Sequence, residues 1–493
     1  METLSKLARK SAEAYPDKTA VKDKDRSFLY RDFMDRAEAL AAYFHAQGLK
    51  KGDRVGILMS NRLEHIELDI AVALAGLIKV PLNYRLHPKE HLYMVEDARL
   101  SLFIGEQELI DAIGVDIPKV FVGNEYETIV AEYMGRSFNE DVQEDDLFAI
   151  MYTSGTTGNP KGVMLSHRNI ISGALSLAQI CEVDYNDIIG HVAPLTHGSN
   201  FLSHVAWLYG STQVVYDKFE PEAFLDYLSE DQVSVLFLVP TMVNLMIQHP
   251  NFDAKKLATV KSINMAGSPI AAAKLQEALG KAGPIFVETY GQVEAPMCIT
   301  MMPRNEIHNR LDSCGRIGPF VDVKIIDDNH QEVAIGEVGE IICKGSLVMK
   351  GYWNNEKATN ETLQDGWLHT GDLGWRDAEG YMHIVDRKKD VIISGGVNIY
   401  PREVEEVLNL HKGVRETCVI GVPDDKWGES VVAFVVPNGK EEVTVETLLS
   451  LCKENLASFK KPKEIFIVEE LPKSSYGKIL KREMKQQHEG VAK

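Results

Sequence analysis

The stretch Met151–His167, MYTSGTTGNPKGVMLSH, decides the fold, because a strand-like apolar run (147–152) leads directly into a loop of glycines, hydroxyl side chains and one lysine. Gly155 and Gly158 let backbone N–H groups converge, because glycine reaches positive φ at little cost. Lys161 adds a positive charge. The hydroxyl donors are Thr153, Ser154, Thr156 and Thr157. The pattern favours a phosphate-binding loop, although a polar surface turn is the alternative that the loop alone leaves open.

The loop is not a Walker A motif, which requires G-x-x-x-x-G-K-[ST]. Gly155 and Gly158 are too close together, and Lys161 follows Pro160 without a Ser or Thr after it. The hydroxyl that holds magnesium in a P-loop therefore has no counterpart here. We expect a nest of backbone donors instead.

Composition points to a soluble globular protein. Of the 493 residues, 45% are hydrophobic and 25% are charged, which is ordinary for this class, and the length suggests about three folding units. A net charge of −19 argues against nucleic acid as the main partner, because a phosphate backbone requires a basic face. The six cysteines show no metal-binding spacing, so we expect free buried thiols in a reducing compartment.

No signal peptide or membrane span is expected. The N-terminus has no apolar core long enough for a signal, and the best apolar run (71–78) is far shorter than the roughly 20 residues of a spanning helix. The final residues Gly-Val-Ala-Lys form no peroxisomal address. We therefore expect a cytoplasmic protein, and we leave open whether it forms a homodimer.

Strand and helix patterns alternate through the first part of the chain, which predicts an α/β fold with parallel sheets covered on both faces. The strand-like runs are 54–60, 101–104, 147–152, 188–193, 233–239, 262–266 and 285–289. The helical runs are 63–78, 167–180, 221–229, a run beginning near Pro240, and 271–279.

The alternation of strand and helix patterns ends near Ile317. Short strand-like runs (321–326 and 339–343) with turn glycines follow and predict a β-rich subdomain. A charged knot, Asp386–Asp390, follows. Beyond it, strands and helices predict a small α+β domain; they lie at 391–394, 401–410, 418–422, 431–436, 445–455 and 465–468. We place the domain boundary in the knot, with a large N-terminal domain at 1–388 and a small C-terminal domain at 389–493.

Several segments match signature motifs in a fixed order. They are Tyr152–Gly162, Thr289–Glu294 (YGxTE-like), Trp367–Asp372 (WxxTGD-like), Asp386–Asp390 followed by Gly395 and Gly396, and Leu471–Ile479 (PxxxxGK-like). Together they resemble the adenylate-forming superfamily of acyl-CoA synthetases, amino-acid adenylation domains and beetle luciferases. The resemblance implies a two-step reaction: a carboxylate attacks the α-phosphate of ATP to give acyl-AMP and pyrophosphate, and coenzyme A then takes the acyl group.

The resemblance also implies roles for residues of the large domain. The loop from Thr153 to Lys161 would cradle the β- and γ-phosphates, and Glu294 would hold Mg²⁺. Tyr290 and Gly291 belong to the nucleotide motif, with the Tyr290 ring against the adenine. Further nucleotide contacts are implied for Gly267 and Ser268 at the adenine, Asp372 at the ribose hydroxyls, and Arg387 near the ribose or phosphate.

The small domain is expected to be mobile and to present two faces in turn. By resemblance, Lys478 would lie between the substrate carboxylate and the α-phosphate, where a positive charge stabilises the transition state. Lys389 matches the position where such enzymes swivel. Gly395 and Gly396 would then line the coenzyme A channel, since absent side chains let a thin thiol arm pass. Solvated surface charge is the plain alternative for both lysines.

One residue departs from the family pattern. Val293 stands where a threonine commonly contacts the α-phosphate. Valine keeps the shape and loses a hydrogen bond of roughly 0.5–1.5 kcal/mol. We expect Thr289 or Thr153 to compensate, or else a slower adenylation step.

The segment Pro194–Phe201 matches the lining of the acyl pocket and contains no aspartate to pair an α-ammonium group. Because that aspartate is missing, an amino-acid substrate is not expected. His197 matches the gate between the ATP site and the acyl pocket. The apolar residues that follow favour a fatty or aromatic acid. The alternatives are transfer to a carrier-protein phosphopantetheine, a luciferase-like oxygenase and a non-catalytic nucleotide sensor.

Overall fold

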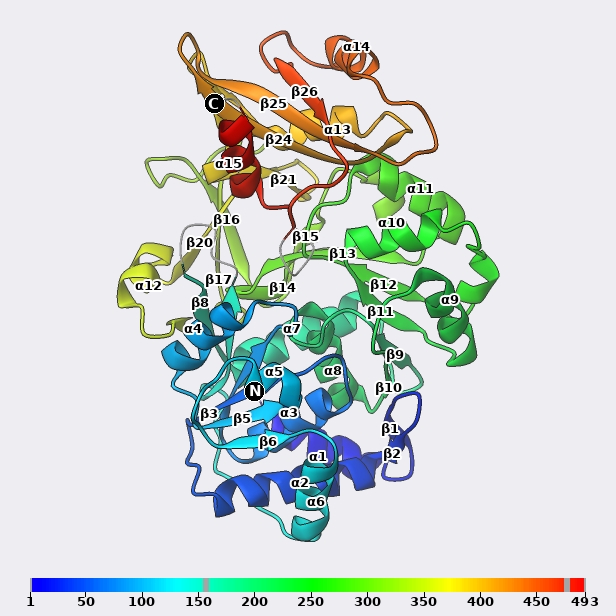
Figure 1. Cartoon of the computed structure of the whole chain (residues 1–493), viewed down its shortest axis with the longest axis vertical. Helices are drawn as coiled ribbons and strands as arrows, with labels where there is room; N and C mark the ends of the chain where they lie inside the picture. Colours follow the sequence, from blue (N-terminus) through cyan, green and yellow to red (C-terminus); the bar gives the residue numbers. More distant parts are fainter. Residues whose placement is uncertain (1, 154–158, 474–478, 492–493) are drawn as a thin grey trace.

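The computed structural model describes residues 2–153, 159–473 and 479–491. Two large, mainly parallel sheets, a smaller antiparallel sheet and a C-terminal unit follow one another along the molecule (Figure 1). The predicted α/β class with a β-rich subdomain is therefore confirmed.

The first large sheet has seven strands in the order β18-β8-β7-β4-β3-β5-β6. Its strands are β3 (Arg54–Leu58), β4 (Ile78–Leu82), β5 (Leu102–Gly105), β6 (Lys119–Phe121), β7 (Leu147–Thr153), β8 (Lys161–Ser166) and β18 (Gly351–Tyr352). Five neighbouring strands of this sheet run parallel, in the order β7, β4, β3, β5 and β6. Strands β7 and β8 form an antiparallel hairpin around the loop quoted above.

The second large sheet has nine strands in the order β15-β14-β13-β12-β11-β9-β10-β1-β2. Its strands are β1 (Thr19–Lys22), β2 (Ser27–Leu29), β9 (Ile188–His191), β10 (Thr212–Val215), β11 (Val235–Leu238), β12 (Ser262–Met265), β13 (Phe286–Gln292), β14 (Ala295–Met302) and β15 (Arg316–Ile317). The neighbours β9, β11, β12 and β13 run parallel, so their carboxyl ends share one edge.

Helices connect the strands of both sheets. They are α1 (Leu4–Ala14), α2 (Tyr30–Ala46), α3 (Glu64–Leu74), α4 (Pro88–Ala98), α5 (Gln107–Asp111), α6 (Asn124–Tyr133), α7 (His167–Ile180), α8 (Gly198–Tyr209), α9 (Pro221–Glu230), α10 (Pro240–Gln248) and α11 (Ala272–Ala282), with short 3-10 turns η1 (Ala254–Leu257) and η2 (Ile307–Asn309). Helix α7 begins where predicted, because Ser166 and Asn169 form a reciprocal capping box. Helix α10 begins at Pro240, which has no N–H to leave unpaired.

One predicted helix is wrong in its last part. The run 63–78 contains helix α3, which ends at Leu74, and Ile78 already begins strand β4. Gly76 has a φ of 65°, a left-handed conformation that ends a helix. Every residue of α3 is buried, so the apolar run carries no helical period that marks its end.

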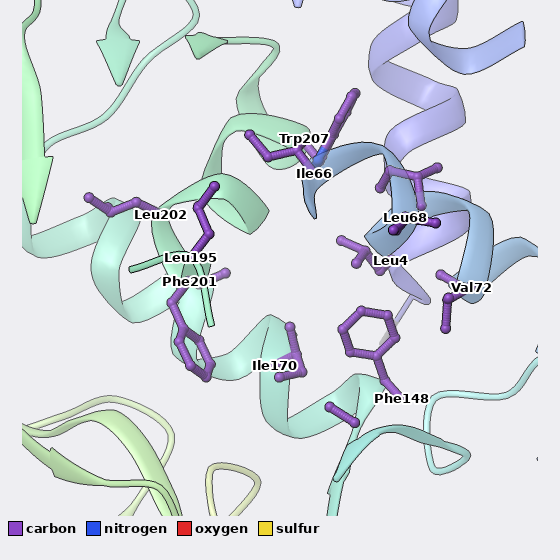
Figure 2. Packing of buried hydrophobic residues seen from close by; sticks show 14 of the residues in the cluster. Leu4, Ile66, Leu68, Val72, Phe148, Ile170, Leu195, Phe201, Leu202 and Trp207 are labelled. Atoms are coloured by element: carbon purple, nitrogen blue, oxygen red, sulfur yellow. The ribbon is translucent and has the colours of Figure 1, made fainter. Parts of the chain in front are cut away.

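A shared core joins the two large sheets (Figure 2). Phe201, Leu202 and Trp207 of α8 belong to the same buried cluster as Ile66 of α3 and Phe148 of β7. Helix α8 is therefore held by the core, and so is the segment Pro194–Phe201, which the sequence assigns to the acyl pocket and which includes the first turn of α8.

The β-rich sheet and the small C-terminal unit follow. The β-rich sheet contains β16 (Asp322–Ile326), β17 (Gly339–Lys344), β19 (Leu363–Gln364), β20 (Trp367–Arg376) and β21 (Met382–Arg387), with α12 (Glu356–Thr362) beside it. After the turn η3 (Lys388–Asp390), the C-terminal unit contains β22 (Ile392–Ser394), β23 (Val397–Ile399), α13 (Pro401–Leu408), β24 (Val414–Asp424), β25 (Gly428–Pro437), α14 (Val445–Asn455), β26 (Glu464–Ile467) and α15 (Lys481–Val491). This unit lies at one end of the molecule (Figure 1). The boundary between residues 388 and 389 stays a prediction.

All six cysteines are buried and free, as expected. Within the described ranges, no helix is long and apolar enough to cross a bilayer.

Candidate active site

The carboxyl ends of four parallel strands bring several predicted residues to one edge of the nine-stranded sheet. His197 follows β9, Gly267 and Ser268 follow β12, and Tyr290 lies near the end of β13. Ligands of open α/β sheets bind at this edge. Gly198, next to His197, packs on the Phe237 ring at the end of β11, where an added Cβ would lie 2.6 Å from the ring. There is therefore no space for a side chain at position 198, next to the predicted gate residue.

The predicted magnesium ligand Glu294 lies in the turn between β13 and β14 and is held from two sides. The Tyr352 hydroxyl donates to Glu294 Oε1 at 2.8 Å, and the Met349 N–H donates to the Glu294 carbonyl at 2.8 Å. Burial first, and then the Glu294 carboxylate, raise the pKa of Tyr352. The phenol therefore stays protonated and donates to the carboxylate throughout the physiological range.

Lys161 reaches the same place from the loop. Its Nζ lies 4.9 Å from the centre of the Tyr352 ring, because β18 pairs with β8 and sets Tyr352 opposite Val163. The ring of Tyr352 thus lies between the predicted phosphate-binding lysine and the predicted metal-binding carboxylate. Thr153 pairs with Lys161 at the mouth of the hairpin. Ser154, Gly155, Thr156, Thr157 and Gly158 lie outside the described residues.

These residues fit a magnesium ion that arrives with its nucleotide. Mg²⁺ keeps several waters and is usually bound through one or two carboxylates plus substrate phosphates. Glu294 supplies one carboxylate, and one of its oxygens, Oε1, is fixed by Tyr352. In the part of the chain that the structure describes, no group of three or more His, Cys, Asp or Glu side chains could hold a metal by itself.

Asp372 forms a second cluster on strand β20 of the β-rich sheet. It is only 4% exposed. The Tyr290 hydroxyl and Gln292 Nε2 both donate to its Oδ2, each at 2.6 Å, and Arg387 Nε lies 2.8 Å from its Oδ1. Asp372 and Arg387 are register partners on β20 and β21. Three motifs that lie far apart in the sequence therefore meet at one carboxylate.

The negative charge of Asp372 raises the pKa values of two neighbouring side chains, Arg387 and Tyr290. The Asp372 carboxylate raises the pKa of Arg387 despite burial. Burial raises the pKa of Tyr290, and Asp372 raises it further, so the phenol remains a donor. A carboxylate offers about four lone-pair positions, so Asp372 retains acceptor capacity beyond these three donors.

The partner of the Thr289 hydroxyl indicates whether Thr289 can replace the hydroxyl that Val293 lacks. Thr289 is 3% exposed, and its hydroxyl donates to Asn264 Oδ1 at 3.1 Å. It lies on the opposite face of β13 from Tyr290, since side chains alternate along a strand. The Thr289 hydroxyl thus already has a partner in the core, which favours Thr153 of the two expected substitutes, and the compensation stays a prediction. Val293 itself packs against the main core cluster.

Three residues of this region escaped the sequence reasoning. Tyr352 stands between short elements with no periodicity to mark it, and Gln292 lies inside a recognised motif without an assigned role. Glu288 shares the face of β13 that carries Tyr290; burial raises its pKa to about 7, against the opposing charge of Arg402. A carboxylate two residues before Tyr290, on the same face of the strand, is the one signal in the sequence that could have found Glu288.

The residues predicted for the small domain lie in η3 and in the β22–β23 hairpin. Lys389 lies in η3, and burial lowers its pKa while Asp390 opposes the shift. Gly395 and Gly396 have φ values of 59° and 79°. The Gly395 N–H donates to the Trp427 carbonyl at 2.7 Å, so this loop packs on the β24–β25 turn. Lys478 lies outside the described residues.

Comparison with known proteins agrees with this geometry. Residues 8–353 match the AMP-binding enzyme family, and residues 403–478 match the AMP-binding enzyme C-terminal domain. A feruloyl-CoA synthase of Amycolatopsis sp is 34% identical over 96% of both chains. A 2-succinylbenzoate–CoA ligase of Bacillus cereus (strain AH820) is 32% identical over 99% of both.

Among solved structures, the ATP-bound MatB of Rhodopseudomonas palustris superposes with a TM-score of 0.92, at 30% identity and with full coverage of both chains. The predicted adenylate-forming resemblance is thus confirmed, and the named relatives are ligases of acids and coenzyme A, in agreement with the predicted use of ATP, Mg²⁺ and coenzyme A. The chain belongs to the family of AMP-binding enzymes and carries that family's C-terminal domain.

Proposed function

We propose that this protein activates a fatty or aromatic carboxylic acid with ATP, releases pyrophosphate, and transfers the acyl group from AMP to coenzyme A. The observation that carries the proposal is that Glu294, Tyr352 and Lys161 form one cluster and Asp372, Tyr290 and Arg387 form another. The first suits a metal-bound polyphosphate and the second a ribose with its adenine.

The proposed division of labour follows from charge. Lys161 and the N–H groups of its loop would neutralise the β- and γ-phosphates as pyrophosphate leaves. Glu294, aimed by Tyr352, would hold the Mg²⁺ that draws electron density from the phosphorus. Lys478 would stabilise the charge where carboxylate meets α-phosphate. The chain would supply positions and charges for a direct transfer at phosphorus.

The side chains near the gate support an apolar acid. Phe201 is 4% exposed and Phe237 is 5% exposed, and both flank the segment that contains His197. Met242, after β11, packs on the two main core clusters. The relatives named for feruloyl and 2-succinylbenzoate substrates act on aromatic acids. We therefore place aryl acids first in the substrate panel and fatty acids second.

Two further points stay proposals. Transfer to a carrier-protein phosphopantetheine is the second candidate for the acceptor, and the coenzyme A ligases among the relatives favour coenzyme A instead. We also keep a cytoplasmic location and a homodimer as proposals, which cell fractionation and size-exclusion chromatography test.

The test is a screen for AMP formation. The protein is incubated with ATP, Mg²⁺ and each of ferulic acid, 2-succinylbenzoic acid, and medium- and long-chain fatty acids, with and without coenzyme A. Acid-dependent AMP that rises with coenzyme A, together with an acyl-CoA product, is the expected result. ATP binding without acid-dependent AMP would favour the non-catalytic sensor, and light emission without a thiol would favour the oxygenase.

A further inference from the structure

Asp386 joins the large domain to the small one at a point that no role above explains. It is 9% exposed and lies on β21 immediately before Arg387. Its Oδ1 accepts from the Arg387 N–H at 2.8 Å, and its Oδ2 accepts from the Arg402 N–H at 2.9 Å. Arg402 is the second residue of α13, so a carboxylate of one domain caps a helix of the other.

The two sides of this contact belong to different bodies. Asp386 is held on the β-rich sheet, because β21 pairs with β20 and sets Asp386 opposite Leu373. Helix α13 packs on β24 of the small domain. The proposed swivel at Lys389 lies between Asp386 and Arg402 in the chain.

A second small-domain element faces the same carboxylate. Lys481, at the start of α15, forms a 2.9 Å ion pair with Glu405 of α13. Burial opposes the charge of Lys481, yet Glu405 and Asp386 outweigh it and raise the lysine pKa. Burial raises the pKa of Asp386, and Lys481 counteracts that shift. Asp386 therefore faces both the N-terminus of α13 and the positive charge of Lys481.

Lys481 follows Lys478 by three positions, and the intervening chain is tied back where the Leu480 N–H donates to the Pro472 carbonyl at 2.9 Å. A third link is present, since Arg402 Nη1 donates to the Ile384 carbonyl of β21 at 2.9 Å.

We propose that Asp386 is a positioning residue, an interdomain latch that holds the small domain in the orientation in which acid is adenylated and that must release before the thiol step. Rotation about Lys389 moves α13 and α15 together and leaves Asp386 on β21, so its hydrogen bond from the Arg402 N–H and the electrostatic attraction of Lys481 are lost together. The inference rests on the proposed function, because it assumes two half-reactions in two orientations.

The test compares Asp386→Ala and Asp386→Asn in separate half-reactions. Pyrophosphate release is measured with ATP and the panel acid on which the wild type is most active, and thioester formation is measured from the preformed acyl adenylate of that acid with coenzyme A. Asp386→Ala removes the cap and the charge and should slow pyrophosphate release about tenfold. Asp386→Asn keeps an acceptor for the Arg402 N–H and should slow it about threefold. Thioester formation should stay within about twofold of wild type in both.

Glu406→Ala is the matched control, because Glu406 pairs with Arg402 Nε at 3.0 Å within α13 and makes this contact inside the small domain. It should leave both half-reactions unchanged. Amide hydrogen exchange supplies a readout that needs no substrate: the Arg402 amide should exchange at least about tenfold faster in Asp386→Ala and not in Glu406→Ala.

The outcomes separate the latch from the proposed function. If the wild type forms no AMP, the proposed function fails, and the exchange measurement alone decides whether Asp386 holds α13. If the wild type performs both steps but the Asp386 variants lose them equally, or lose neither, the latch is contradicted while the proposed function stands. An Asp386→Ala protein that does not fold leaves Asp386→Asn to decide by the same criteria.

Discussion

Tyr352 donates a 2.8 Å hydrogen bond to Glu294 and presents its ring to Lys161. One aromatic side chain therefore orients the proposed metal ligand and lies beside the proposed phosphate ligand. Because β18 carries Tyr352 into the first large sheet and Glu294 follows the last parallel strand of the second, this contact also joins the two sheets at the site.

Glu294→Gln should keep the fold and lower pyrophosphate release by on the order of 100-fold, because a neutral amide is a poor magnesium ligand. Tyr352→Phe is the matched control. It leaves the carboxylate and removes one hydrogen bond, so a loss of about fivefold is expected. Rapid-quench measurement of pyrophosphate checks both. Near wild-type release in Glu294→Gln would exclude Glu294 as the metal ligand.

Asp372→Asn should raise the KM for ATP about tenfold, because the neutral side chain loses the charge that holds Arg387 and a strong acceptor for ribose. Asp322→Asn, an exposed carboxylate on β16 of the same sheet, should change nothing. Steady-state kinetics with varied ATP decide the matter. An unchanged KM would mean that Asp372 serves only the local network with Tyr290 and Gln292.

Val293→Thr should leave ATP binding similar and either raise the adenylation rate or leave it unchanged, because the Thr289 hydroxyl already has a partner in Asn264. Pre-steady-state pyrophosphate release provides the measurement. A loss of more than tenfold, about 1.4 kcal/mol in the barrier, would show that the valine is itself required.

Lys478→Ala should abolish adenylation and still form thioester from preformed acyl adenylate. Lys389→Pro should do the reverse and accumulate acyl-AMP, because proline fixes φ and blocks the swivel. Lys473→Ala, which breaks an ion pair with Glu416, serves as the control for a lost surface lysine. If both variants lost both steps equally, Lys478 and Lys389 would be interpreted as ordinary charged surface residues.

Glu288 should make stability depend on pH. Burial raises its pKa from 4.5 to about 7, so the folded protein binds this proton more tightly than the unfolded chain, and stability falls as pH rises between those values. As pH rises from 5 to 8, the free energy of unfolding of Glu288→Gln should therefore increase relative to that of the wild type by about 1 kcal/mol. The melting temperature of the variant should rise relative to wild type in the same direction. Calorimetry at several pH values checks this. An equal difference at every pH would contradict the assignment.

Motif order and alternation predicted the fold class well, since hydrophobic period and turn glycines are local signals. They worked for α7 and α14, where caps mark the ends. They failed between α3 and β4, where a fully buried helix passes into a fully buried strand, so neither element has an exposed face that would show its period. Strand β14 was missed for the same reason, since it is buried on both faces and does not alternate.

The site was predictable where one motif supplies one residue and not where separate elements meet. Glu294, Asp372 and Arg387 stand in recognisable motifs. Tyr352 contacts Glu294 only because β18 pairs with β8, and Asp386 accepts from the Arg402 N–H only because α13 packs against β21. Such contacts depend on how sheets and domains pack, and a local sequence pattern carries no record of that packing.

The most direct test of the central claim follows an oxygen atom. The acid that is most active in the panel is labelled with ¹⁸O in its carboxylate and incubated with the protein, ATP, Mg²⁺ and coenzyme A, and the AMP is examined by mass spectrometry. If the carboxylate attacks the α-phosphate and the thiol then breaks the acyl–oxygen bond, AMP gains one ¹⁸O for each acyl-CoA formed. AMP without the label, or ADP in place of AMP, would contradict the account.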